Sequence, residues 1–171
     1  MPRSDAPDAI TLLKDDHRKV EDLFEKFEKA KGAERKQAIA QKICIELTVH
    51  AQIEEEIFYP ACEGAVEEDL VKEATVEHDS AKVLIAEIEA GGPDEEFYDA
   101  KVKVLQELIE HHVEEEERRV EGMFSQARKA GLDMDELGRQ LIARKEELMA
   151  QIQREGPTPP EPSTFDTVGL R

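Results

Sequence analysis

The sequence predicts an all-α protein, an up-down-up-down four-helix bundle with an additional C-terminal helix. Hydrophobic residues make up 39% of the 171 residues and charged residues 37%, a balance typical of amphipathic helices. Apolar residues recur at steps of three and four through four stretches, at about 8 to 30, 34 to 61, 66 to 90 and 94 to 129. Only short segments with Gly32, Gly64 and Gly91-Gly92-Pro93 separate these stretches, so consecutive helices should be antiparallel neighbours.

The chain is long enough for one domain with a real core, which we expect over residues 1–155. The bundle should occupy about 8–130, and the extra helix about 134–154, after a cap at Asp133 or Asp135. This helix should cover one side of the bundle or a partner subunit. Residues 156–171 are rich in proline, which cannot continue a helix, so we expect a flexible tail there.

Charge and composition exclude several classes of function. A net charge of -18 would repel phosphate backbones and anionic lipids, so neither nucleic acid nor membrane is expected as a partner. The sequence has no 18-residue apolar run and no signal-peptide core at its N-terminus, which favours a cytoplasmic protein. Cys44 and Cys62 lie about 27 Å apart on one predicted helix, at roughly 1.5 Å per residue, and cannot form a disulfide there.

An internal repeat divides the chain into two related helical hairpins. His50 follows His17 by 33 residues, and His112 follows His78 by 34. Each second histidine opens an acidic cluster, HAQIEEE at 50–56 and HVEEEE at 112–117. Counted from the turns, the four histidines should meet at one level near the middle of the bundle.

Each of the four predicted helices carries one of these histidines on its apolar stripe. His17 follows Ile10 and Leu13, and His78 follows Val71 and Ala74, at helical spacing. In the second and fourth helices a glutamate follows the histidine on the same stripe, Glu54 after His50 and Glu116 after His112. All six side chains should therefore be buried.

These six buried polar groups predict a metal centre. One histidine on an apolar face is more often a satisfied core residue than a ligand, but four at one level are different. Buried Glu54 and Glu116 need a counter-charge, and no lysine or arginine points inward beside them. Imidazole with carboxylate suits iron, manganese or zinc, and six donors exceed the needs of one ion, so we expect two. Ferritin-like di-iron bundles use Glu-x-x-His instead, a spacing this chain lacks.

The fourth helix offers two competing registers. His112 with Glu116 continues the stripe of Val102, Leu105, Ile109, Val120 and Met123, whereas His111 with Glu115 lies one residue away, about 100° around the helix. We assign the first register to the core. The other acidic residues, Glu55, Glu56, Glu114, Glu115 and Glu117, are interpreted as a solvated face, and Phe58 and Tyr59 as packing residues.

Four segments together resemble a known family: KDDHRKV around His17, His50 to Glu54 followed by IFYP, VEHDSAK around His78, and HHVEEEE with His112 to Glu116. Over about residues 8 to 130 the chain resembles the hemerythrin-like, or HHE cation-binding, domain. The resemblance implies two iron ions with an oxo or hydroxo bridge. It implies His17, His50, His78 and His112 as terminal ligands and Glu54 and Glu116 as bridging ligands.

The resemblance also implies binding of dioxygen, peroxide or nitric oxide, which we take as the leading function. One departure concerns simple oxygen carriage: the oxygen-carrying hemerythrins place a further histidine where this chain has Ala74. Each iron would then keep an open position, which favours redox chemistry. Alternatives are a peroxide- or NO-detoxifying enzyme, an iron store, and an acidic interaction bundle with incidental metal.

Overall fold

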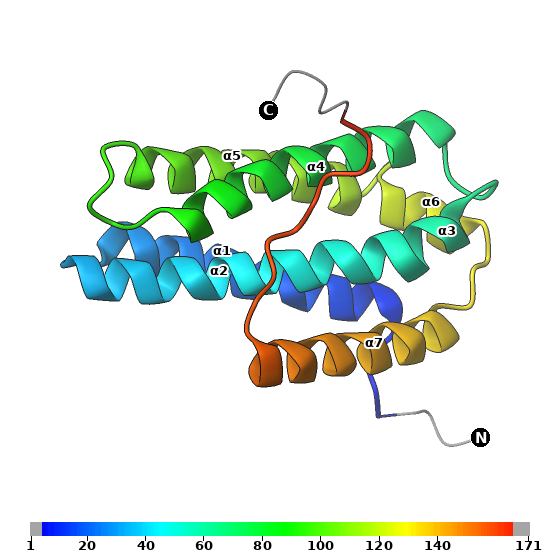
Figure 1. Cartoon of the computed structure of the whole chain (residues 1–171). Coiled ribbons are helices and arrows are strands. Elements are labelled where there is room, and N and C mark those ends of the chain that lie inside the picture. Colours follow the sequence, from blue (N-terminus) through cyan, green and yellow to red (C-terminus); the bar gives the residue numbers. More distant parts are fainter. Residues whose placement is uncertain (1–4, 166–171) are drawn as a thin grey trace.

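The computed structural model describes residues 5–165, which contain helices and no strand, so the all-α prediction is confirmed. Four long helices lie along one another (Figure 1): α1 (Ala9–Lys29), α2 (Ala33–Ile53), α4 (Glu68–Ala90) and α5 (Tyr98–Glu117). Helix α1 packs on α2 and α4 packs on α5, while contacts of α2 with α4 and of α1 with α5 join the two pairs. The two hairpins of the sequence repeat are therefore the two halves of one body.

Short polar side chains define where two of the helices begin. The Asp8 carboxylate accepts a hydrogen bond from the Thr11 amide at 2.8 Å, which caps the first turn of α1. Helix α7 (Met134–Glu155) begins in the same way, because Asp133 accepts from the amide of Glu136 at 3.0 Å. Of the two predicted caps for the extra helix, Asp133 is the one used.

The buried apolar side chains form two clusters on either side of the histidine level. One cluster lies toward the α1–α2 and α4–α5 turns and includes Phe24, Ile43 and Leu105. The other includes Leu13, Phe58 and Leu141 and joins the opposite end of the bundle to α7. A polar layer thus separates two apolar cores.

The second helix contains a π-helical turn that its periodicity did not predict. After α2 the chain continues through η1 (Glu54–Phe58) into α3 (Tyr59–Cys62), and the Tyr59 amide donates to the carbonyl of Glu54, five residues back. Pro60 has no amide proton and would clash with the fourth carbonyl before it, which a wider turn avoids. Regular helical spacing would continue the apolar stripe from Glu54 through Ile57 and Ala61. The inserted residue rotates this stripe, so Ile57 and Ala61 are only partly buried. The residues buried there are Phe58, Tyr59 and Cys62.

The fourth helix ends earlier than predicted. Helix α5 stops at Glu117, and a loop over 118–122 leads to the short helix α6 (Met123–Lys129). Val120, which the continuous stripe would bury, is 66% exposed. A Cβ atom on Gly122 would lie 2.3 Å from the Arg118 carbonyl oxygen, so the tight loop requires glycine at this position.

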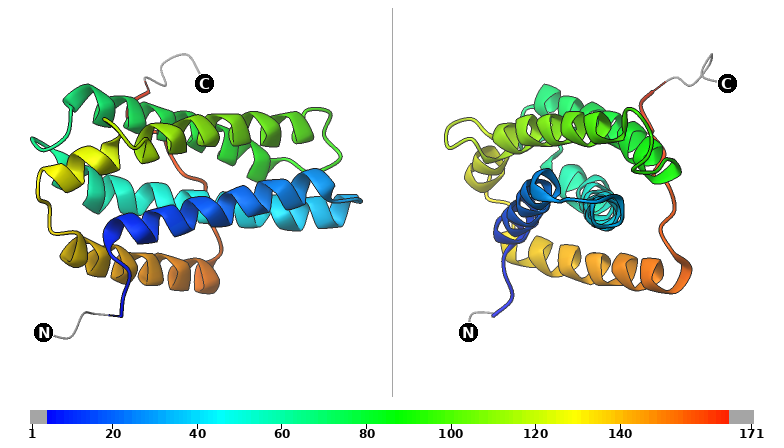
Figure 2. Two further views of the ribbon diagram at one scale, coloured as in Figure 1. Left: turned by 180° about the vertical axis from the view of Figure 1, so that it is seen from behind. Right: turned by 90° about the vertical axis from the view of Figure 1, so that its left-hand side faces the viewer.

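Helix α7 covers the side of the bundle formed by α1 and α2 (Figure 2), which is one of the two roles predicted for it. Arg144 of α7 pairs with Glu56 at 2.7 Å, and Gly138 packs against the chain that enters α1. The extra helix therefore belongs to the same packed unit as the bundle.

The segment that follows α7 runs across α2 toward α4 (Figure 1). There the amides of Ser163 and Thr164 donate to the buried Asp79 carboxylate at 3.1 and 2.6 Å. Nothing in the proline-rich composition indicated this anchor. Residues 166–171 of the predicted tail lie outside the described residues. Over the described range, no helix has the length and apolarity that crossing a membrane requires.

The close approach at Gly138 predicts that Gly138→Ala lowers the free energy of unfolding by about 1–3 kcal/mol, the usual cost of overpacking. An added Cβ would lie 2.6 Å from the Pro7 carbonyl oxygen, which is backbone and cannot rotate away. Chemical denaturation measures the change, and Gly92→Ala is the control because its Cβ would have no neighbour within 4 Å. Equal stability of the two variants would contradict tight docking of α7.

Candidate metal centre

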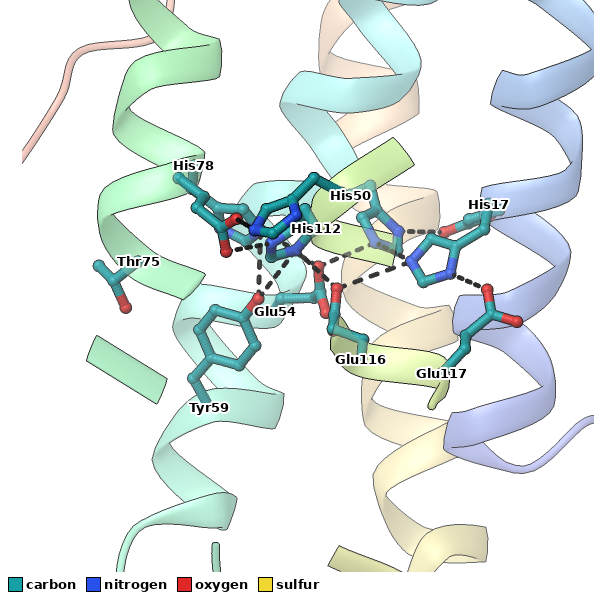
Figure 3. Close-up of polar contacts among 12 residues, drawn as sticks. His17, His50, Glu54, Tyr59, Thr75, His78, His112, Glu116 and Glu117 are labelled. Atoms are coloured by element: carbon teal, nitrogen blue, oxygen red, sulfur yellow. Dashed lines mark hydrogen bonds and ion pairs between the residues drawn. The ribbon is translucent and has the colours of Figure 1, made fainter. Parts of the chain in front are cut away.

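The six residues predicted as ligands meet in the polar layer between the two apolar clusters (Figure 3). None of the six is more than 6% exposed. The four long helices supply one histidine each, while one carboxylate comes from the π turn and the other from the last turn of α5. In chain order they are His17, His50, Glu54, His78, His112 and Glu116.

The histidines form two pairs. The Nε2 atoms of His17 and His50 are 3.2 Å apart, and those of His78 and His112 are 3.1 Å apart. Two atoms that bind one ion at about 2.1 Å and at angles of 90–109° are separated by about 3.0–3.4 Å. Each pair of ring nitrogens therefore has the spacing of two ligands on a shared ion.

Each carboxylate lies close to both histidine pairs. Glu54 Oε1 is 2.8 Å from His50 Nε2 and 3.4 Å from His78 Nε2. Glu116 Oε1 is 2.6 Å from His112 Nε2 and 3.8 Å from His17 Nε2. A carboxylate placed between two ligand pairs can bridge two ions. The donors therefore form two groups, His17 with His50 and Glu116, and His78 with His112 and Glu54.

The buried carboxylate oxygens have no hydrogen-bond donor. Although the imidazole nitrogens approach them closely, their geometry is not that of a hydrogen bond, and all four oxygens of Glu54 and Glu116 remain unsatisfied among the described residues. Leaving a buried carboxylate without a partner is costly, and a cation removes that cost. Two divalent ions fit this donor set in both charge and chemistry.

The pKa values describe how the site is charged when it holds only protons. Burial would lower the pKa of His50, but the carboxylates of Glu54 and Asp16 together outweigh burial and raise the pKa to about 10. Burial and then the negative charge of Glu54 raise the pKa of Glu116 to about 7. Protons on these groups occupy the positions that a metal would take, so metal binding must release protons.

A carboxylate lies beside the second ring nitrogen of each histidine. These contacts fix the ring orientation, and an Nδ1–H that donates to a carboxylate leaves Nε2 free as a metal ligand. The Nδ1 atoms lie 2.7–3.2 Å from their partners: His17 to Glu117, His50 to Asp16, His78 to Glu55 and His112 to Glu77.

Sequence reasoning missed these four acidic residues, and it assigned Glu55 and Glu117 to a solvated face. Their arrangement follows the internal repeat, which could have revealed them. The acid before the first histidine of a hairpin contacts the second histidine of the same hairpin. The acid after the buried glutamate of a hairpin contacts the first histidine of the other hairpin. Asp16 and Glu77 are the acids that precede a first histidine, and Glu55 and Glu117 are the acids that follow a buried glutamate.

Lysine and arginine side chains hold the supporting carboxylates in turn. Lys145, from α7, contacts Asp16, and Lys82 donates to Glu55 at 2.7 Å. Arg18 contacts Glu117. The extra C-terminal helix therefore contributes to the orientation of a histidine ring, through Lys145, Asp16 and His50.

Besides these four acids, the sequence did not predict that Tyr59 lies at the candidate site. Its hydroxyl oxygen lies 3.2 Å from His78 Nε2 and 3.3 Å from His112 Nε2 (Figure 3). Burial and then the charge of Glu116 raise its pKa well above the usual range, so the phenol is neutral. The π turn explains its position, because the inserted residue rotates Tyr59 into the core.

The polar layer borders a small apolar cavity of about 20 Å³, which has room for roughly one water-sized molecule. Its walls include Val20, Leu47, Ile85 and Val113 together with the four histidines of the site. On the other side of the layer, Ala74 is buried with the apolar cluster near α7. Beside the carboxylates of Glu54 and Glu116, the second histidine pair therefore has the Tyr59 hydroxyl as a neighbouring oxygen, whereas Ala74 offers no polar atom.

The rival register of the fourth helix lies outside the centre. The His111 side chain is 61% exposed and contacts Glu115 at 3.2 Å and Glu77 at 3.4 Å. His112 and Glu116 are both buried, which agrees with the register chosen from the apolar stripe.

The model of the hemerythrin HHE cation-binding domain family matches residues 8–124, more than half of the chain. The chain belongs to this family. A crystal structure of a hemerythrin HHE cation-binding domain-containing protein from Mycobacterium kansasii superposes with a TM-score of 0.73 over 88% of this chain and 95% of that one. The two sequences are 24% identical, so this likeness concerns the fold alone.

A curated relative of this HHE-domain chain is a protein from Nostoc sp. that is named a DNA nickase. The two are 29% identical over 106 residues, which is 62% of this chain. The matched part spans 30% of the relative's length. The nickase activity is therefore a property of a much longer protein.

The chosen register predicts that His112→Ala and Glu116→Ala each remove most of the bound metal, because each takes a buried donor from the centre. His111→Ala is the matched control, one residue away and exposed, and should keep the metal content of the unaltered protein. Elemental analysis with the absorption spectrum of the loaded protein measures both. Loss of metal in His111→Ala and retention in His112→Ala would reverse the assignment.

Metal removal should lower the free energy of unfolding by about 3 kcal/mol or more, because Glu54 and Glu116 would be left buried without a full counter-charge. Thermal unfolding before and after chelation, followed by circular dichroism, gives the difference. Re-addition of the metal should restore the melting temperature. Identical melting of the two forms would show that the carboxylates are stable without a cation.

Proposed function

We propose that this HHE-domain protein is a non-haem di-iron protein that binds or senses a small molecule such as dioxygen, peroxide or nitric oxide. The ions would lie within an up-down-up-down four-helix bundle. His17 and His50 would hold one ion and His78 and His112 the other, with Glu54 and Glu116 bridging them. Family membership supports cation binding, and the choice of iron rests on the mixed imidazole and carboxylate donor set.

The observation that carries this proposal is that no residue in the range 5–165 donates a hydrogen bond to Glu54 or Glu116, while each of the four buried histidines has a carboxylate at its Nδ1 atom. A polar core that was only structural would satisfy its own buried oxygens with hydrogen bonds. Here each imidazole ring is held by a carboxylate at its Nδ1 atom, while the Nε2 atoms face the carboxylates of Glu54 and Glu116. That arrangement leaves the charge and the lone pairs for metal ions.

The surroundings limit what the centre can bind. The adjoining cavity has space for about one water-sized molecule, and apart from the histidines its walls are mostly aliphatic, with Asp16, Thr48 and Lys82 as the polar exceptions. A diatomic gas or peroxide fits this space, whereas an organic substrate or an iron mineral core does not. The small volume of the cavity favours binding of a small ligand over iron storage.

Iron at this centre would supply a reversible change of oxidation state and open positions for the small ligand. The protein supplies the rest. Its carboxylates orient the rings, the aliphatic walls exclude bulk water, and the neutral Tyr59 hydroxyl provides a proton donor beside the second histidine pair.

Peroxide breakdown is a second candidate, and the Tyr59 hydroxyl is the observation that favours it. Reducing or disproportionating peroxide requires protons to be delivered to oxygen inside a dry site. Tyr59 is buried, protonated and within 3.3 Å of two ligand nitrogens. The enzyme and the binding protein would use the same centre and differ in what happens after the ligand enters.

Fully loaded protein should contain two iron ions per chain, and stopped-flow mixing with peroxide should separate the two candidates. A binding protein should form a persistent adduct with about one equivalent, whereas an enzyme should consume many equivalents and release dioxygen. Metal-free protein is the control and should do neither. An iron content of one or less would contradict the dinuclear proposal.

Tyr59→Phe should keep the two ions and the fold, because phenylalanine preserves the buried ring, but it should slow peroxide consumption at least tenfold. If the protein only binds its ligand, the substitution should change the spectrum of the adduct instead. Tyr98→Phe is the matched control, since Tyr98 is equally buried but lies in the other apolar cluster. Equal behaviour of the two variants would assign Tyr59 to packing.

A further inference from the structure

A hollow of about 280 Å³ lies on the surface beside the metal centre, where the end of α5, the following loop and α6 meet the first half of α1. Buried Phe124 forms part of its floor. Basic residues surround this floor: Lys14, Arg118, Arg119, Arg128 and Lys129. We refer to this feature as the basic hollow.

The charge of the basic hollow is opposite to that of the whole chain. The protein carries a net charge of -18, yet five cations and a single carboxylate, Glu117, line this hollow. That carboxylate already accepts from His17 and contacts Arg18. The hollow therefore has a clear excess of positive charge.

Most of these cations have no counter-charge of their own. Lys14, Arg119, Arg128 and Lys129 form no ion pair with another residue in the range 5–165, and Arg118 reaches Glu114 only at 3.9 Å. By contrast, exposed lysines elsewhere commonly pair with a carboxylate one turn away, as Lys26 does with Asp22. Four cations without an ion pair therefore line one hollow, and their positive charge would attract an anion.

The irregular backbone after α5 produces this arrangement. A continuous helix would have spread Arg118 and Arg119 along its outer face. Because α5 stops at Glu117, and Gly122 permits the tight loop, both arginines line the same hollow as Lys14. Helix α6 then adds Arg128 and Lys129 from its last turn.

We propose that the basic hollow binds a small phosphate-bearing anion. Arginine forks and lysine ammonium groups match phosphate oxygens, and the Ser125 hydroxyl in the same hollow is a further donor. The volume suits one or two phosphate groups with a small apolar part against Phe124. A long polyanion such as DNA would extend beyond the hollow over a strongly acidic surface, which repels it.

The position next to Glu117 connects the hollow to the metal centre. Glu117 both lines the hollow and accepts from His17 Nδ1 at 2.7 Å. An anion held by Lys14 and the arginines would add negative charge near this carboxylate without displacing a metal ligand. The binding site itself does not depend on the proposed redox function.

Calorimetric titration of the metal-loaded protein with pyrophosphate at low ionic strength tests the proposal. The double substitution Arg119→Gln with Arg128→Gln should weaken binding at least tenfold, while metal content and helicity stay unchanged. The double substitution Lys31→Gln with Arg154→Gln is the matched control, since it removes the same charge from exposed, unpaired residues outside the hollow. This control should bind as the unaltered protein does. Added salt should weaken binding to the hollow.

Three results would overturn the proposal. Binding retained in the Arg119 and Arg128 variant would place the pyrophosphate elsewhere, for example on the metal ions. Equal weakening in both double variants would indicate unspecific attraction to positive charge. Tight binding of a 20-base-pair DNA duplex without measurable binding of pyrophosphate would identify the surface as a nucleic-acid contact.

Discussion

Glu54 and Glu116 lie in the middle of the protein, where no described residue donates a hydrogen bond to them, and much of the structure is arranged around them. Buried negative charge of this kind is tolerated only where a cation compensates it. Histidine nitrogens surround the two carboxylates at ligand spacing, and further carboxylates hold the histidine rings from behind. The two apolar clusters are separated by this layer, so packing and site geometry depend on the same few buried groups.

The internal repeat explains how this layer is built from two similar hairpins. Within a hairpin, the acid before the first histidine holds the second, as Asp16 holds His50. Between hairpins, the acid after each buried glutamate holds a histidine of the other half, as Glu117 holds His17. Neither hairpin therefore has a complete set of oriented rings by itself. This reciprocity favours assembly of the two halves into one bundle and fixes their relative height.

The π turn and the early end of α5 both lie next to predicted metal ligands. The π turn begins at Glu54 and rotates Tyr59 toward the second histidine pair, and the break after Glu117 follows directly on Glu116. In each case, a proline or a glycine a few residues away accounts for the irregular backbone. The first departure adds a hydroxyl to the metal centre. The second ends α5 and brings basic side chains together around Glu117.

The sequence by itself determined the helical class, the register of His112 and Glu116, and the burial of the six polar residues, because each follows from helical periodicity along a single element. It could not locate Tyr59, since a stripe extrapolated at 3.6 residues per turn is displaced by one inserted residue at a π turn. It also misplaced Glu55 and Glu117, whose partners lie on other helices. Tertiary structure decided these contacts, the docking of α7 and the anchoring of Ser163 and Thr164 on Asp79. They depend on how the elements pack together, which the local pattern of residues does not encode.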